Sequence, residues 1–266
     1  MTRPPRNMSP EEARALMAGP LGDEMARFPC RFAAPLYFGE PPSRESPVVI
    51  NNGTASLLKL RGEYLVITCS HVIEQFRRRL AQGQHCLFAV ANCYFDPLPQ
   101  IIAEDKVVDS AVLQLTRQQA DDITRNSNGI GEAFFEVDQQ TPTPVRVNDF
   151  LAYSGFPSDF RQIMSLDELS FGTYSSGACR VTDVYSDYIT CQFERDYWIT
   201  NFIDAEPKTL GGLSGGPAFA IHHSPGGIFS YSFAGVIYRM HEGTESLFIR
   251  QAYALPVSWE NQDDAC

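Results

Sequence analysis

Short apolar segments bounded by turn-forming residues recur along the chain from residue 47 onward. They lie at 55–60, 64–68, 86–90 and 111–115 in the first half, and at 145–147, 150–157, 177–181, 188–193, 217–221, 233–238 and 251–255 in the second. Many short strands with turns between them are typical of a β-sandwich or a β-barrel. The sequence therefore predicts an all-β fold, and periodicity alone does not choose between the two architectures.

Two local patterns in the first half predict particular elements. The Asn-Asn-Gly run at 51–53 separates apolar residues at 48–50 from those at 55–60, which predicts a hairpin turn. The apolar residues that follow His71 recur at helical spacing and predict a short amphipathic helix.

The N-terminal part has a different character. Ser-Pro-Glu-Glu at 9–12 is typical of a helix start. We expect a short helix through about Met17 that ends near Gly19-Pro20, followed by an extended or irregular lead-in over 28–46. This gives three expected units, an N-terminal extension at 1–46, a first β-unit with a polar linker at 47–143, and a second β-unit at 144–266.

Composition excludes several classes of protein. The net charge is −11, whereas a nucleic-acid binder usually shows a basic face. The sequence contains no run of about 18 apolar residues, so no membrane-spanning helix is expected. The seven cysteines include no Cys-x-x-Cys pair, so a structural zinc site is not expected. Without an export signal, reduced thiols in the cytoplasm are expected, and a mature secreted chain that has lost its signal is the alternative.

Three residues have the side chains that a serine nucleophile requires. Ser214 lies in Gly-Leu-Ser-Gly-Gly-Pro at 212–217, His71 follows an apolar strand, and Asp109 precedes another. A serine hydroxyl needs a base to take its proton, a carboxylate to orient that base, and N–H donors for the oxyanion. Each residue also has a simpler interpretation, as a tight turn, a packed histidine and a capping aspartate. Together, in the order His, Asp, Ser, they predict a catalytic triad.

The same serine also fits the Gly-x-Ser-x-Gly elbow of α/β-hydrolases. That elbow requires a buried strand before the serine, a helix after it, and the order serine, acid, histidine. The residues before Ser214 do not form an apolar strand, and Gly-Gly-Pro follows it. His222, His223 and His241 lie downstream, so this alternative stays open.

The His71, Asp109 and Ser214 motifs together resemble the trypsin/chymotrypsin-like serine protease family, in its bacterial or intracellular form. The resemblance covers about residues 47–258 and implies two six-stranded antiparallel β-barrels, with the first carrying His71 and Asp109. It implies that Ser214 is the nucleophile, His71 the general base and then acid, and Asp109 the group that orients the imidazole. The N–H groups of Gly212 and Ser214 would form the oxyanion hole. Peptides or proteins are the implied substrates, with no cofactor and no metal.

The chain departs from secreted animal members of that family at two positions. Those members usually have a disulfide-bonded cysteine directly after the histidine, where this chain has Val72. They also have an aspartate directly before the nucleophile, which pairs with a new N-terminus after zymogen cleavage, where this chain has Leu213. We therefore expect activity without a freed N-terminus. The N-terminal extension is expected to be where a protein regulator would bind.

The resemblance also implies a primary substrate pocket. The residue six before the nucleophile, Lys208, would lie at its base with Thr209 beside it, and the strand after Gly235 would form a wall. That wall would contain three residues, Tyr238, Arg239 and Met240. A buried lysine there would favour an acidic or polar substrate side chain. The alternative is that Lys208 points into solvent.

Two other function classes remain open from the sequence. The first is a protease-fold binding or scaffold protein without turnover, which a collapsed oxyanion hole would produce. The second is an esterase that uses the same serine.

Overall fold

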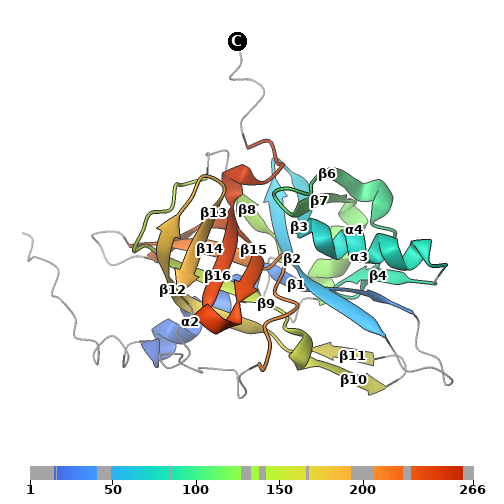
Figure 1. The fold of residues 1–266 in the computed structure, drawn as a ribbon, viewed down its shortest axis with the longest axis horizontal. Helices are drawn as coiled ribbons and strands as arrows, with labels where there is room; N and C mark the ends of the chain where they lie inside the picture. Colours follow the sequence, from blue (N-terminus) through green and yellow to red (C-terminus); the bar gives the residue numbers. More distant parts are fainter. Residues whose placement is uncertain are drawn as a thin grey trace, which may run out of the picture.

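The computed structural model describes residues 15, 17–40, 49–83, 85–126, 133–137, 142–165, 168–192, 207–223 and 229–259. These residues form two β-sheets that lie side by side, with few helices (Figure 1). The first sheet contains β1 (Ala33–Gly39), β2 (Ile50–Leu60), β3 (Glu63–Thr68), β4 (Leu87–Val90), β5 (Cys93–Tyr94), β6 (Ile101–Asp105), β7 (Ser110–Leu115) and β8 (Phe135–Val137). The second contains β9 (Phe150–Gly155), β12 (Tyr174–Val184), β13 (Tyr188–Gln192), β14 (Pro217–His223), β15 (Phe229–His241) and β16 (Ser246–Gln251).

The helices and one small hairpin lie outside these sheets. The helices are α2 (Pro20–Cys30), α3 (Ser70–Ala81) and α4 (Arg117–Asn126), and the hairpin is β10 (Arg161–Ser165) with β11 (Glu168–Phe171). No helix in the described ranges has the length and apolar character to cross a membrane.

The two sheets differ in topology. The second closes into a six-stranded antiparallel barrel in the order β12-β13-β16-β15-β14-β9, as the family resemblance implied. The first has eight strands in the path β5-β4-β1-β2-β3-β7-β6, with β8 added parallel to β2. The expectation of a six-stranded, wholly antiparallel first barrel is therefore wrong, because β1 and β8 bring in segments from outside the predicted strands.

Strands β2, β3 and β7 place alternate residues in two different cores. Leu57, Val66 and Leu113 pack into the core of the first sheet, whereas their neighbours Leu58, Ile67 and Val112 pack into a core shared with the barrel. Successive side chains of a strand point to opposite faces, so a strand buried on both faces is apolar throughout. The central strands therefore join the two halves of the molecule.

The shared core contains apolar residues from both sheets. The barrel contributes residues such as Phe219, Phe233 and Val236 to it. Aromatic rings meet edge to face within it, including Phe219 with Phe135 at a centroid distance of 4.9 Å. Contacts of this type fix the position of one sheet on the other.

The expected hairpin turn at 51–53 is not formed, because these residues belong to the continuous strand β2. Asn51 donates to Gln75 on α3, and Asn52 donates to the carbonyl of Phe156 at 2.9 Å. The two asparagines therefore link neighbouring elements instead of reversing the chain. Tertiary contacts override the turn preference here.

The N-terminal predictions are partly wrong. Ala15 and Met17 are helical and residues 18–19 form a turn and a bend, so a helix ends where the sequence predicted. Pro20 then starts a second helix, α2, which was not predicted; this position suits proline because its missing N–H would have no partner there. The helix packs on β9 and β12, where a Cβ on Gly177 would lie 3.0 Å from the backbone nitrogen of Ala26. Residues 33–39, expected in an extended or irregular lead-in, are extended and form β1. The helix start expected at 9–12 lies outside the described residues.

Two predictions in the second half also need correction. Residues 145–147 form no strand. The segment 251–255 contains only the end of β16 and then a short 3-10 turn, Ala252–Ala254. The linker region before them contains the helix α4 and the strand β8.

Candidate active site

His71 lies in the first turn of α3, directly after the strand β3. The first N–H groups of a helix have no partner within it. Here the backbone N–H of His71 donates to Oδ1 of Asp109 at 2.9 Å. The negative charge of the carboxylate is also stabilised at this end of the helix, because the helix dipole is positive there. Asp109 therefore holds the main chain from which the imidazole projects.

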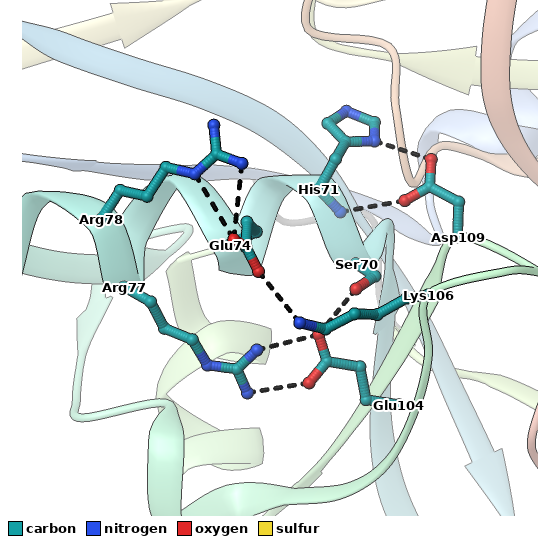
Figure 2. Close-up of polar contacts among 8 residues, drawn as sticks. All are labelled: Ser70, His71, Glu74, Arg77, Arg78, Glu104, Lys106 and Asp109. Carbon is teal, nitrogen blue, oxygen red and sulfur yellow. Dashed lines mark hydrogen bonds and ion pairs between the residues drawn. The ribbon is translucent and has the colours of Figure 1, made fainter.

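The other oxygen of the same carboxylate contacts the imidazole. Nδ1 of His71 lies 2.7 Å from Oδ2 of Asp109 (Figure 2). A carboxylate only accepts hydrogen bonds, so Nδ1 must carry the proton, and the neutral ring then has its lone pair on Nε2. Figure 2 shows this second nitrogen on the side of the ring that faces away from Asp109. The His71 side chain is 42% exposed and the Asp109 side chain 24% exposed.

The turn between β6 and β7 places Asp109. Oδ1 of Asp105 accepts from the N–H groups of Val107 at 2.7 Å and Val108 at 3.0 Å, which closes a tight side-chain turn. Asp109 then adopts a φ of 57°, which is uncommon for a residue other than glycine. Ser110 pairs with Asp105 and starts β7. This backbone directs the carboxylate of Asp109 toward α3.

An ion pair holds α3 against β6, next to the same turn. Arg77 bonds both oxygens of Glu104, with nitrogen–oxygen distances of 2.9 and 2.8 Å (Figure 2). Ser70 donates to the same carboxylate at 2.6 Å. The hydrogen bond from Arg77 lowers the pKa of Glu104. The helix that carries His71 is thus held to β6, next to the turn that carries Asp109.

Ser214 lies in a tight loop between residue 207 and β14. The loop turns on Gly212 and Gly215, which have φ values of 101° and 91°. A Cβ on Gly215 would lie 2.1 Å from the carbonyl oxygen of Thr54, so only glycine fits. Leu213 is buried and contacts Gly155, where it acts as an apolar anchor for the loop.

Cys69 connects the serine loop with the His71–Asp109 pair. Its thiol donates to the carbonyl of Ile237 at 3.4 Å and is fully buried. Burial raises the pKa of Cys69, the charge of Asp109 raises it further, and hydrogen bonds from the Gly215 backbone and the Ser214 side chain lower it. The Ser214 hydroxyl therefore lies against Cys69.

The same cysteine lies close to both His71 and Asp109. The potential ligand atoms of Cys69, His71 and Asp109 all lie within 4.8 Å of one another. Among the described residues no hydrogen bond joins Ser214 to His71, and Cys69 is the residue that lies close to both.

Two amides of the serine loop donate no hydrogen bond to the described part of the protein. Within the described part of the chain, neither the N–H of Gly212 nor that of Ser214 donates to a protein acceptor. By contrast, the amides of Leu213, Gly215 and Gly216 all bond to backbone carbonyls. These are the two donors that the sequence analysis assigned to an oxyanion hole.

The residues expected in a substrate pocket do not share one environment. Lys208 is exposed, which agrees with the alternative that it points into solvent, and Arg239 is also exposed. Thr209 bonds through its N–H to Asp159. Met240 packs against the barrel core. The Tyr238 ring lies under the guanidinium of Arg250. The role of these five residues in substrate recognition stays a prediction.

Arg250 is a residue that the sequence analysis missed. Its guanidinium lies 4.0 Å from the ring centroid of Tyr238, forms an ion pair with Asp187, and donates to the carbonyl of Val107 at 3.3 Å. It is nearly buried, although it starts from the barrel strand β16. A single arginine in an apolar segment of the sequence does not indicate which residues it contacts. Through it, the barrel contacts the turn that carries Asp109.

We expect Cys69 to be protected from alkylation in the folded protein. Only a thiolate reacts with iodoacetamide, and burial of Cys69 disfavours that form. Mass spectrometry should find Cys69 unmodified before unfolding and modified after it, with the half-buried Cys86 as the internal control. A Cys69→Ala variant should keep its reactivity toward serine-directed probes. Complete native alkylation of Cys69 would contradict this expectation.

Solved structures similar to this chain include trypsin/chymotrypsin-like serine proteases. The active form of the Rv3671c protease from M. tuberculosis is 14% identical, with 98% of this chain and 96% of that chain covered and a TM-score of 0.41. Deg5 is 15% identical, with 92% of each chain covered and a TM-score of 0.43. The scabies mite inactivated protease paralogue S-I1 is 10% identical, with 86% and 92% covered and a TM-score of 0.42.

No protein-family model matches the chain, and no curated protein matches its sequence. Because the structural similarities combine low identity with low TM-scores, we base the function on the chain's own residues.

Proposed function

We propose that this protein is a serine endopeptidase that works through Ser214, His71 and Asp109 in a chymotrypsin-like double-barrel fold. The observation that carries the proposal is the double contact of Asp109 with the backbone N–H and Nδ1 of His71. This contact leaves a lone pair on Nε2, in a site that also holds a serine between two positive-φ glycines. A packed or capping histidine has no need of such an arrangement.

In the proposed reaction, Oγ of Ser214 attacks the carbonyl carbon of a peptide bond while Nε2 of His71 takes its proton. The serine hydroxyl must first exchange its contact with Cys69 for one with Nε2. Catalytic hydrogen bonds are often long before substrate binds, so their absence from the free protein does not oppose this step.

The carbonyl oxygen then becomes negative and accepts hydrogen bonds from the amides of Gly212 and Ser214. Collapse of this intermediate breaks the C–N bond, and the amine leaves with the proton from His71. Water attacks the resulting ester, loses a proton to His71, and releases the acid as Ser214 recovers its proton. Asp109 stays ionised and stabilises the imidazolium at both stages.

This mechanism needs no cofactor or metal, since the chain's own residues supply nucleophile, base and oxyanion donors. Peptides or proteins are the proposed substrates, and a regulator that binds the N-terminal extension remains a proposal. The six described cysteines are free thiols, which supports a reducing compartment such as the cytoplasm.

A fluorophosphonate probe tests this function on the full chain. We expect the probe to label the uncleaved protein starting at Met1, because Leu213 cannot form an ion pair with a freed N-terminus. Ser214→Ala should not be labelled. A binding protein without turnover would give no labelling of either form, and an esterase would be labelled but would cleave esters and not peptides. Labelling that appears only after cleavage, with the new terminus buried near Ser214, would contradict this prediction.

A further inference from the structure

Thr54 is completely buried on β2 and contacts the serine loop at two points. Its backbone N–H donates to the carbonyl of Ser214 at 2.8 Å. Its hydroxyl donates to the carbonyl of Gly212, also at 2.8 Å. These two carbonyls belong to the same residues whose amides form the proposed oxyanion hole, so one residue of the first sheet holds both.

The same hydroxyl also has a partner in the barrel. Oγ1 of Thr54 accepts from the N–H of Phe156 at 3.0 Å. The carbonyl of Thr54 in turn accepts from the hydroxyl of Thr68 at 2.9 Å. The hydroxyl therefore donates once and accepts once, and its direction is set at both ends. A hydroxyl with a fixed donor and a fixed acceptor can hold a peptide plane in one orientation.

We propose that Thr54 is a positioning residue for the oxyanion hole. Its hydroxyl holds the carbonyl of Gly212 and thereby orients the loop that carries the two oxyanion donors. This inference rests on the proposed function and names a residue that the triad does not include. When the carbonyl of Gly212 is fixed, the following peptide is fixed too, and with it the path of the chain to the Ser214 amide. Leu213 has no carboxylate for an ion pair, so the loop takes its order from this hydroxyl and from apolar packing.

The consequence for catalysis follows from the geometry that an oxyanion hole requires. Its donors must lie at the position of the oxyanion before the charge develops, and small displacements are costly. Removing the Thr54 hydroxyl leaves the carbonyl of Gly212 and the N–H of Phe156 without partners. We therefore expect the serine loop to shift in such a variant. The hydrogen bonds between His71 and Asp109 do not involve Thr54, so this pair should stay in place.

The test compares Thr54→Val, which keeps the shape but loses the hydroxyl, with Thr54→Ser, which keeps the hydroxyl. We expect Thr54→Val to lower kcat by about 10- to 100-fold with little change in KM, and Thr54→Ser to restore most of it. Thr190→Val is the matched control, because this nearly buried threonine also makes two side-chain hydrogen bonds, to Thr182 and Asp183, on the far strands of the barrel. It should leave kcat unchanged.

Amide hydrogen exchange gives a readout that needs no turnover. The amide of Phe156, which donates to the Thr54 hydroxyl, and that of Leu213, which belongs to the same peptide plane as the Gly212 carbonyl, should exchange faster in Thr54→Val than in the wild type and Thr54→Ser. If the wild type fails to react with the fluorophosphonate, the proposed function is wrong. Amide hydrogen exchange then still shows whether Thr54 holds the serine loop. Unchanged exchange and unchanged kcat in Thr54→Val, or equal losses in Thr54→Val and Thr54→Ser, would overturn the inference.

Discussion

Replacement of Ser214 or of His71 by alanine is expected to lower peptide cleavage by on the order of 10⁶-fold. The nucleophile and the base act as one unit, because the hydroxyl has little nucleophilicity until Nε2 takes its proton. The double variant should therefore be hardly worse than either single one. Purified variants and a sensitive fluorogenic peptide pool would measure these effects.

Thermal unfolding is the control for both variants. Ser214 and His71 are only half-buried, so their truncation should leave the midpoint nearly unchanged. Robust cleavage by purified Ser214→Ala would remove this serine from the mechanism. Losses that multiply in the double variant would contradict the idea that the two residues act together.

Asp109→Asn is expected to lower kcat by about 10⁴-fold while the fold is preserved. The carboxylate accepts from both the backbone N–H and Nδ1 of His71. An asparagine has one acceptor, and the backbone N–H must take it. Its NH₂ group then donates to Nδ1, which forces the ring proton onto Nε2. In that tautomer His71 cannot accept the proton of Ser214.

Asp105→Asn is the matched control in the same turn. It removes the same charge, but one oxygen of Asp105 accepts both backbone N–H groups, and asparagine keeps that acceptor. We expect near-normal activity from it. Nitrogen NMR of the His71 ring would report the tautomer directly. An Asp109→Asn protein with normal kcat, or one that still has its proton on Nδ1, would contradict the assigned role of the carboxylate.

The sequence predicted those strands in which the pattern of apolar residues alone indicates which side chains are buried. In β7, Val112 and Leu113 face two different cores, and the continuous apolar run indicates this directly. The helix after His71 was also predicted, because its apolar residues recur at helical spacing. These elements carry their own signal, and the residues placed in the site came from motifs within or next to them.

Other features could not be predicted, because their cause is distant in the sequence. Asn52 favours a turn by itself, and only contacts with Phe156 and Arg161 make it part of a strand. Pro20 is compatible with both the end of one helix and the start of another. Thr54 and Arg250 lie in no motif. Their roles arise from partners more than 100 residues away, which a single sequence does not pair.

The contacts between β2 and the serine loop have a consequence for biosynthesis. All strands of the sheet with His71 and Asp109 precede residue 214 in the sequence, so the ribosome synthesises them first. Once made, the loop lacks the Thr54 contacts until the barrel docks on that sheet. Neither half alone would therefore hydrolyse the nascent polypeptides around it. An inhibitor that contacts both halves should therefore raise the temperature at which they separate.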